Sequence, residues 1–206
     1  MSKLKIPVQT VQSGILQENV IMLGDRSMKR LKIPAHIPIQ LAFGSFRQEV
    51  TVIPAPKSDS LRVSEGLARR TGWKSRYTLN VSYSSGSRTL RLGPLIGVLV
   101  SRDHSDTPDR VFGPITMFCR ELTNACRIQG AYVYFFTPEA LESRSSSIHG
   151  WVYDEGWKKL NLPIPDVINN RLTSRKVENK PSVQHFLADV KSRFGTHFFN
   201  EKFLDK

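Results

Sequence analysis

Long hydrophobic runs, cysteines and acidic residues are all scarce in this sequence of 206 residues. The longest apolar run, residues 94–100, has the length of a strand, whereas a membrane-spanning helix needs roughly 20 apolar residues. No charged-then-apolar leader opens the sequence, because Pro7, Gln9 and Glu18 interrupt its first stretch. With 39% hydrophobic and 23% charged residues, the composition excludes fibrous and disordered classes. We therefore expect a cytoplasmic protein without a membrane segment.

The two cysteines, Cys119 and Cys126, fall in one predicted helix. At a rise of about 1.5 Å per residue their Cα atoms are separated by roughly 10 Å, beyond the roughly 7 Å limit for a disulfide. Neither His104 nor His149 stands at ligand spacing from them, so we predict no metal site. The sequence predicts reduced cysteines that pack as small hydrophobic side chains.

Basic charge is concentrated in the first part of the chain. Residues 1–92 hold 15 basic and 5 acidic residues, a net charge of +10, whereas residues 93–206 hold 15 and 13, a net charge of +2. The step predicts a domain boundary near Leu92 or Gly93. A small module of charge +10 attracts polyanions, and the candidate polyanion-binding residues are Arg69, Arg70, Lys74 and Arg76. A solvated basic surface without one ligand is the equal alternative.

The first 92 residues show the signals of a small β-rich domain. Residues 38–43 and 46–53 predict a hairpin around Gly44-Ser45, and alternation from Tyr77 predicts a second hairpin that ends at Leu92. Between the hairpins, Ser64 can cap a short helix that Gly72 closes. We predict a barrel or sandwich with one helix and no internal repeat.

From Gly93 the pattern changes to alternating strands and helices. A buried strand over residues 95–100, an amphipathic helix opened by Gly113-Pro114 and a strand over 131–136 predict a βαβ unit. A hairpin over 148–162, a strand at 166–169 and a helix over 181–194 follow. The predicted fold class is α+β or α/β, with a β-rich domain before an α/β domain.

No motif for catalysis or nucleotide binding accompanies these elements. The sequence has no G-x-S-x-G, no phosphate-binding loop, no H-E-x-x-H, and no G-x-G-x-x-G after the strand at 95–100. We therefore predict no catalytic residue and no metal site. A nucleic-acid-binding protein is the least favoured alternative, because no helix-turn-helix, zinc finger or aromatic RNA-binding signature is present.

Three arginines are the candidate substrate-binding residues. Arg171 and Arg175 follow the strand at 166–169, and Arg102 takes the matching position after the strand at 95–100. Ligands of α/β sheets bind at the carboxyl ends of strands, where a guanidinium can clamp a carboxylate or a phosphate. Solvated or ion-paired arginines are the alternative.

Three stretches resemble the YheC/YheD endospore coat-associated proteins of spore-forming bacilli. They are Leu-Gly-Pro-Leu-Ile-Gly-Val-Leu at 92–99, Trp157 with Pro-Ile-Pro-Asp-Val-Ile-Asn-Asn-Arg at 163–171, and Phe-Asn-Glu-Lys-Phe-Leu-Asp-Lys at 199–206. Asn169 stands where that family typically has Tyr. The resemblance covers the chain, more weakly over residues 1–92.

The resemblance implies an ATP-grasp protein of which this chain is the N-terminal part. Relatives carry a C-terminal ATP-grasp domain, the fold of carboxylate–amine ligases, and that domain would begin at residues 201–206. Residues 93–200 would then form a Rossmann-like pre-ATP-grasp domain on the substrate side of the cleft, behind a basic accessory domain at 1–92. We expect no cofactor in this chain, because ATP and Mg²⁺ belong to the absent domain, and no catalysis by the chain alone.

The resemblance also implies partners and a location. The chain would be spore-associated, with spore coat components or another acidic molecule as partner. The alternative function is a non-enzymatic spore structural or polyanion-binding module that acts through the basic first domain.

Overall fold

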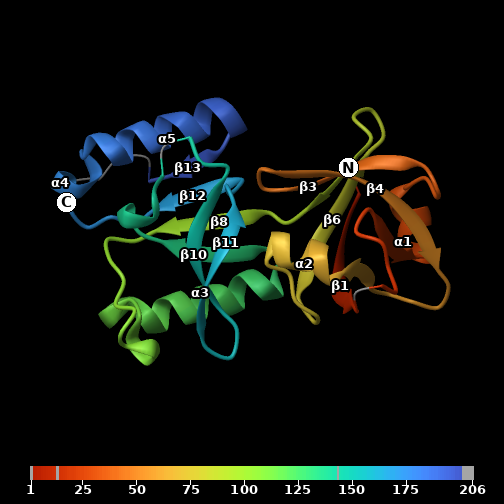
Figure 1. Ribbon diagram of the computed structural model, residues 1–206, viewed down its shortest axis with the longest axis horizontal. Coiled ribbons are helices and arrows are strands. Elements are labelled where there is room, and N and C mark those ends of the chain that lie inside the picture. Colours follow the sequence, from red (N-terminus) through yellow and green to blue (C-terminus); the bar gives the residue numbers. More distant parts are fainter. Residues whose placement is uncertain (1, 13, 143, 201–206) are drawn as a thin grey trace. The chain divides into compact units, whose positions relative to one another are not determined.

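Two separate sheets organise the computed structural model, which describes residues 2–12, 14–142 and 144–200 (Figure 1). The first unit contains the described residues up to Pro94 together with Arg127–Ala131. The second contains Leu95–Cys126 and the described residues from Tyr132 onward. The predicted mixed α and β class is confirmed. The predicted start of a further domain at 201–206 lies outside the described residues.

Seven strands of the first unit close into a barrel, so a sandwich is ruled out for this unit. Their order around the barrel is β1-β5-β2-β4-β3-β7-β6. The interior is filled by alternate residues of each strand, such as Leu41 and Phe43 of β3, neither of which is exposed. The strands are β1 (Lys3–Val11), β2 (Val20–Gly24), β3 (Pro38–Phe43), β4 (Phe46–Ala55), β5 (Leu61–Ser64), β6 (Thr78–Ser84) and β7 (Thr89–Leu92).

The strand pairing of the barrel has an internal twofold pattern. β1 pairs in parallel with β5, and β4 pairs in parallel with β2. Likewise β1 is antiparallel to β6, and β4 is antiparallel to β3. Strands β1, β2 and β3 therefore correspond to β4, β5 and β6, and each pairing keeps its direction when the corresponding strands are exchanged. The prediction of no internal repeat is wrong at the level of structure.

The strand registers show which residues of the two copies are equivalent. Each residue from 20 to 43 is equivalent to the residue 40 positions later, from 60 to 83, without a gap. Met22 pairs with Arg62 across β2 and β5, and these two residues are each other's equivalents, so the pseudo-twofold axis passes between them. The two copies keep buried positions but few identities, and the repeat is hidden in the sequence for this reason.

Two short helices occupy equivalent places in this repeat. The predicted helix is α2 (Glu65–Thr71), where the Leu67 N–H donates to Ser64 Oγ at 3.2 Å and Gly72 adopts φ +75°. The other is α1 (Asp25–Leu31), which the sequence reading missed, so the prediction of one helix is wrong. Gly24 before α1 offers no capping side chain, and Lys32 rather than glycine ends it at φ +58°, so neither usual boundary signal is present.

A mixed six-stranded sheet forms the second unit. Its order is β11-β10-β9-β8-β12-β13, with parallel pairing from β9 to β13 and antiparallel pairing at β10 and β11. The predicted βαβ unit and hairpin are both present. The strands are β8 (Leu95–Leu99), β9 (Tyr132–Phe136), β10 (Ser147–Tyr153), β11 (Trp157–Pro163), β12 (Val167–Asn170) and β13 (His197–Phe199).

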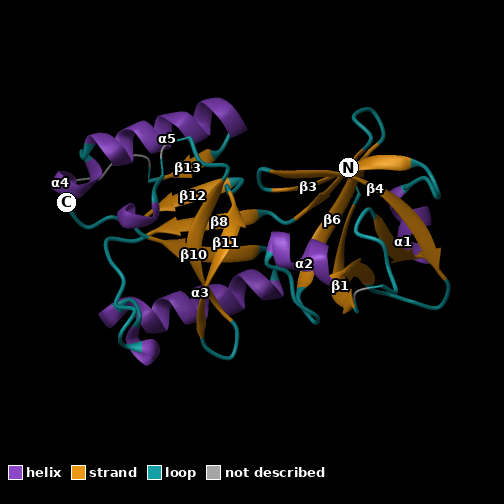
Figure 2. Ribbon diagram, in the orientation of Figure 1, coloured by secondary structure: helices purple, strands orange, loops and turns teal. Residues whose placement is uncertain are grey.

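The helices α3 (Thr116–Ile128) and α5 (Pro181–Phe194) lie on opposite faces of this sheet (Figure 2). The chain crosses from β8 through α3 to β9 on one side, and from β12 through α5 to β13 on the other. Because parallel crossovers are right-handed, connections that leave in opposite directions carry their helices to opposite faces. The point between β8 and β12 is thus a topological switch point.

Candidate functional site

The switch point lies at the carboxyl ends of β8 and β12, which are neighbouring parallel strands. Asn170 pairs with Leu99 in this register, so the segments after both strands begin side by side. Crevices at such points are where open α/β sheets bind ligands, because the two connections diverge and leave the strand ends uncovered. We refer to residues 100–104 and 170–175 as the switch-point edge.

Two hydroxyl side chains join the segments of this edge. Ser101 Oγ lies 3.0 Å from Thr173 Oγ1, and it also accepts the Thr173 backbone N–H at 3.1 Å. The Arg171 N–H donates to the Leu99 carbonyl at 2.8 Å. Ser101 and Thr173 were not predicted as site residues. Their one sequence signal was a hydroxyl residue shortly after each strand.

Arg171 and Arg102 both belong to the switch-point edge, and both are exposed. The Arg171 guanidinium stacks on the Phe118 ring of α3, 5.2 Å from its centroid, and this holds it beside the strand ends. Arg175 begins the short helix α4 (Arg175–Glu178), one turn beyond the strand end. The register thus brings the segments of Arg102 and Arg171 together, and Arg175 lies farther along the chain.

A buried polar pair shapes the chain around Arg171. Asn170 is 7% exposed and Glu178 is 6% exposed, and Asn170 Nδ2 donates to Glu178 Oε1 at 2.7 Å. Asn170 Oδ1 also accepts the Leu172 backbone N–H at 3.1 Å. Asn170 therefore fixes the turn that carries Arg171 and acts as a positioning residue.

Replacing Asn170 with alanine should destabilise the second unit and loosen the edge. The substitution removes two hydrogen bonds, one of them to a buried carboxylate, and we expect a loss of about 2 kcal/mol. Urea unfolding measures this loss, and hydrogen exchange at the Leu172 and Thr173 amides reports the loosening. Asn169→Ala is the matched control, since Asn169 is only half-buried. Equal hydrogen-exchange rates at the Leu172 and Thr173 amides in the two variants would contradict this role for Asn170.

Asp103 of the first segment is a structural residue. Its Oδ2 accepts the Trp151 indole N–H and lies 3.4 Å from Lys159 Nζ. These contacts anchor the loop after β8 to β10 and β11. Arg102 of the same loop is exposed.

Cys119 packs in the core between α3 and the sheet. It is fully buried, and this burial raises the pKa of its thiol to about 12, against a smaller lowering by the nearby Arg171 charge. Cys126 is half-buried, and its pKa is also raised by burial. Both thiols are free, as predicted, and neither is activated as a nucleophile.

The raised pKa of Cys119 predicts a loss of stability at high pH. In the unfolded chain the thiol ionises near 9.0, whereas the folded protein keeps it neutral up to about 12. The contribution of the neutral Cys119 thiol to the free energy of unfolding is therefore complete below pH 9. Above pH 9 this contribution falls by about 1.4 kcal/mol for each pH unit. Cys119→Ala should flatten the fall in unfolding free energy between pH 9 and 11, while Cys126→Ala should leave most of it. Identical profiles for Cys119→Ala and the unsubstituted chain would contradict this origin.

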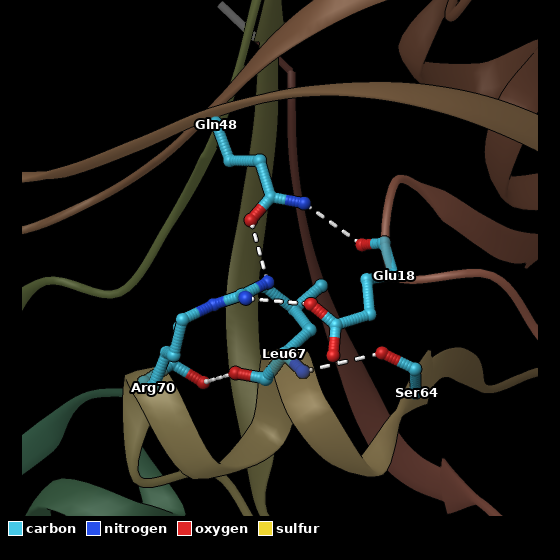
Figure 3. A network of polar contacts seen from close by, with 6 residues as sticks. Glu18, Gln48, Ser64, Leu67 and Arg70 are labelled. Carbon is cyan, nitrogen blue, oxygen red and sulfur yellow. Dashed lines mark hydrogen bonds and ion pairs between the residues drawn. The ribbon is translucent and has the colours of Figure 1, made fainter. Parts of the chain in front are cut away.

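The predicted polyanion-binding residues meet different surroundings in the first unit. Figure 3 shows Arg70 between Glu18, whose Oε2 lies 2.6 Å away, and Gln48, whose Oε1 lies 2.8 Å away. Its charge is therefore balanced by a carboxylate. Lys74 is half-buried, while Arg69 and Arg76 are exposed.

A pocket of about 350 Å³ also opens on the first unit. It has lining charges of both signs, from Asp25, Arg26, Lys57 and Asp59, together with Ser58. Across the described residues, no three His, Cys, Asp or Glu side chains gather as a metal site would need. The described helices include none with the length and apolar character required to cross a membrane.

One curated protein is similar to this chain over a long segment. It is the endospore coat-associated protein YheD of Bacillus subtilis (strain 168), with 28% identity over 119 residues. The resemblance to the YheC/YheD family is confirmed. The aligned segment covers 57% of this chain, and the chain spans about a quarter of the length of YheD, 26%.

Two further comparisons gave no relative. No protein-family model matches the sequence. No solved structure matches significantly. The similarity to the YheC/YheD family therefore rests on sequence.

Proposed function

We propose that the second unit supplies the substrate-binding side of a carboxylate–amine ligase-type cleft in a YheC/YheD-like, endospore coat-associated protein. The observation that carries this proposal is the placement of Arg102 and Arg171 at a switch point between adjacent parallel strands. In this proposal the unit is a Rossmann-like pre-ATP-grasp domain. Its four parallel strands and the helices on both faces support that assignment.

Each side chain of the edge has a role in this proposal. Arg171 binds a substrate carboxylate through two parallel N–H donors, which is the geometry that its planar guanidinium favours. The ring of Phe118 limits its rotation. Ser101 and Thr173 are hydrogen-bonded to each other, which leaves one of their two hydroxyl protons to donate to a substrate, and Arg102 adds a second positive charge. The edge thereby orients an acidic substrate.

The chemical step belongs to another part of such a protein. An ATP-grasp domain would hold ATP and Mg²⁺ and convert a carboxylate to an acyl phosphate, and this chain would not react alone. The location we propose is the spore, with spore coat components as partners. The name of the matched relative supports this location.

Nuclear magnetic resonance titration of the 206-residue chain tests the site. Glutamate and inorganic phosphate are the probes. We expect the amide chemical shifts of Ser101, Arg171 and Thr173 to change at millimolar concentrations of these probes. Arg171→Gln should abolish these shifts. Arg193→Gln is the matched control, because Arg193 lies on α5 in an ion pair with Asp189 at 2.9 Å.

Two results would overturn the proposal. Shifts spread evenly over exposed arginines would remove the site, since no position would be preferred. Hydrolysis of Mg-ATP by the isolated chain would show that it is catalytic without another domain.

A further inference from the structure

The surface of α1 carries a concentration of unpaired positive charge. Arg26, Lys29 and Arg30 lie in the helix, and Lys32 follows at its C-cap. All four side chains are exposed. Within the described part of the chain, none of them makes an ion pair or a side-chain hydrogen bond. We call these four residues the α1 cluster.

The internal repeat shows that the fold does not require this charge. Across the pseudo-twofold axis, the equivalents of the α1 cluster are Gly66, Arg69, Arg70 and Gly72. The second helix therefore has two cations in place of four, and Arg70 is neutralised by Glu18. Two helices in the same structural role thus differ in free charge.

The cations are arranged to act together. Arg26, Lys29 and Arg30 stand at helical positions i, i+3 and i+4, which share one face, while Met28 and Leu31 are buried on the other. Neighbouring like charges on a helix repel each other, so the cluster weakens the isolated helix. An anion bound along the helix would reverse that effect. Asp25 and Asp59 lie at the pocket beside Arg26, which leaves Lys29, Arg30 and Lys32 as the stronger anion contacts.

The kind of anion follows from what surrounds the cluster. Among the described residues of the first unit, the exposed large hydrophobic side chains are Ile15, Ile37 and Ile128, and none lies on α1. Protein interfaces are rich in aromatic residues and poor in lysine, so a protein partner fits this surface badly. Single-stranded nucleic acid needs exposed aromatic rings for base stacking, and none of the described aromatic side chains of this unit is exposed.

A regular row of phosphates fits these features. Seven helical residues span about 10 Å, and over that length of axis the two strands of a duplex together carry about six phosphates, one per roughly 1.7 Å, so each of the four cations can contact one. We propose that the α1 cluster binds the phosphate backbone of duplex DNA without reading its sequence. This interaction needs no sequence-reading motif, because phosphate contacts carry no base information. It is independent of the ligase-type cleft proposed for the second unit.

Fluorescence anisotropy with a labelled DNA duplex tests this proposal on the 206-residue chain. Four phosphate contacts predict a slope of about −3.6 for the logarithm of the binding constant against the logarithm of salt concentration. The variant Arg26→Gln, Lys29→Gln, Arg30→Gln, Lys32→Gln should bind at least about tenfold more weakly at 0.1 M salt and with a slope near zero. The matched control is Lys3→Gln, Arg69→Gln, Arg76→Gln, Arg88→Gln, which removes the same charge from the same barrel. It should keep most of the affinity, and circular dichroism confirms that both variants fold.

Each of the other outcomes would overturn the proposal. Equal weakening of the two variants would mean diffuse attraction by net charge, and greater weakening of the control would place the site around α2. Competition by polyglutamate as strong as by unlabelled duplex would indicate an acidic polypeptide as partner. Tighter binding to single-stranded DNA would indicate base contacts, and tighter binding to vesicles of anionic lipid would indicate a membrane surface.

Discussion

Gly24→Ala should lower the unfolding free energy of the first unit by about 3 kcal/mol, the upper end of the usual cost of overpacking. A Cβ atom at Gly24 would lie 1.9 Å from the Ser58 carbonyl oxygen, a main-chain atom that cannot rotate away. The φ of Gly24 is −59°, which alanine adopts without strain, so the requirement for glycine here comes from the close approach alone. Urea unfolding followed through the amide signals of the first unit in nuclear magnetic resonance measures the effect, because tryptophan fluorescence would also report Trp151 and Trp157 of the second unit.

Gly66→Ala is the informative control for this prediction. Its Cβ would lie 2.0 Å from Glu18 Oε1, nearly the same distance, but that atom is the end of a flexible, exposed side chain. Alanine in the helix gains about 0.5 to 1 kcal/mol, and loss of the exposed Glu18–Arg70 pair costs a similar or smaller amount. We expect a stability within about 0.5 kcal/mol of the unsubstituted chain. If the two alanine variants were equally stable, the close approach at Gly24 would be refuted.

Phe135→Ala should destabilise the second unit by about 3 to 5 kcal/mol, the range for removing a buried aromatic ring. Phe135 is not exposed, and its ring centroid lies 5.5 Å from that of Phe112 and 5.6 Å from that of Trp157. The core around it includes Val98 and Cys119, so strands β8 and β9 and helix α3 all lose contacts when the ring is removed. Chemical denaturation gives the free energy.

The exposed Phe199 is the matched control for Phe135. It is 64% exposed, so Phe199→Ala should change stability by less than about 0.5 kcal/mol. Phe135→Leu keeps most of the buried volume and should fall between the two variants. A loss below about 1 kcal/mol for Phe135→Ala would mean that the surrounding core collapses into the cavity.

The proposed duplex binding by α1 and the proposed substrate binding at the switch-point edge can be examined in the same chain. In these proposals the first depends on the α1 cluster of the first unit, and the second depends on Arg171 and the hydroxyl groups of Ser101 and Thr173. Asn170→Ala should therefore alter the glutamate titration and leave DNA affinity unchanged. The α1 variant should do the reverse.

Elements formed by residues close in sequence could be predicted from the sequence alone. Ser64 and Gly72 delimit α2, the apolar spacing defines α3 and α5, and the turn at Gly44-Ser45 joins β3 and β4. In these cases a local signal is decisive, because a cap, a turn residue or a periodic face acts over a few positions. The candidate arginines of the edge were found in the same way, from their position after a buried strand.

The tertiary structure alone decided how these elements are combined. Parallel pairing of β1 with β5 and of β2 with β4 closes the barrel and creates the repeat, and β8 meets β12 across about 70 residues of chain. Such pairings depend on burial summed over the whole unit, and no short window of sequence records them. The ion pair of Arg70 with Glu18, the hydroxyl pair of Ser101 with Thr173 and the free charge of α1 have the same origin. Each of these features depends on whether the fold places a residue that is distant in sequence within hydrogen-bonding or ion-pairing distance.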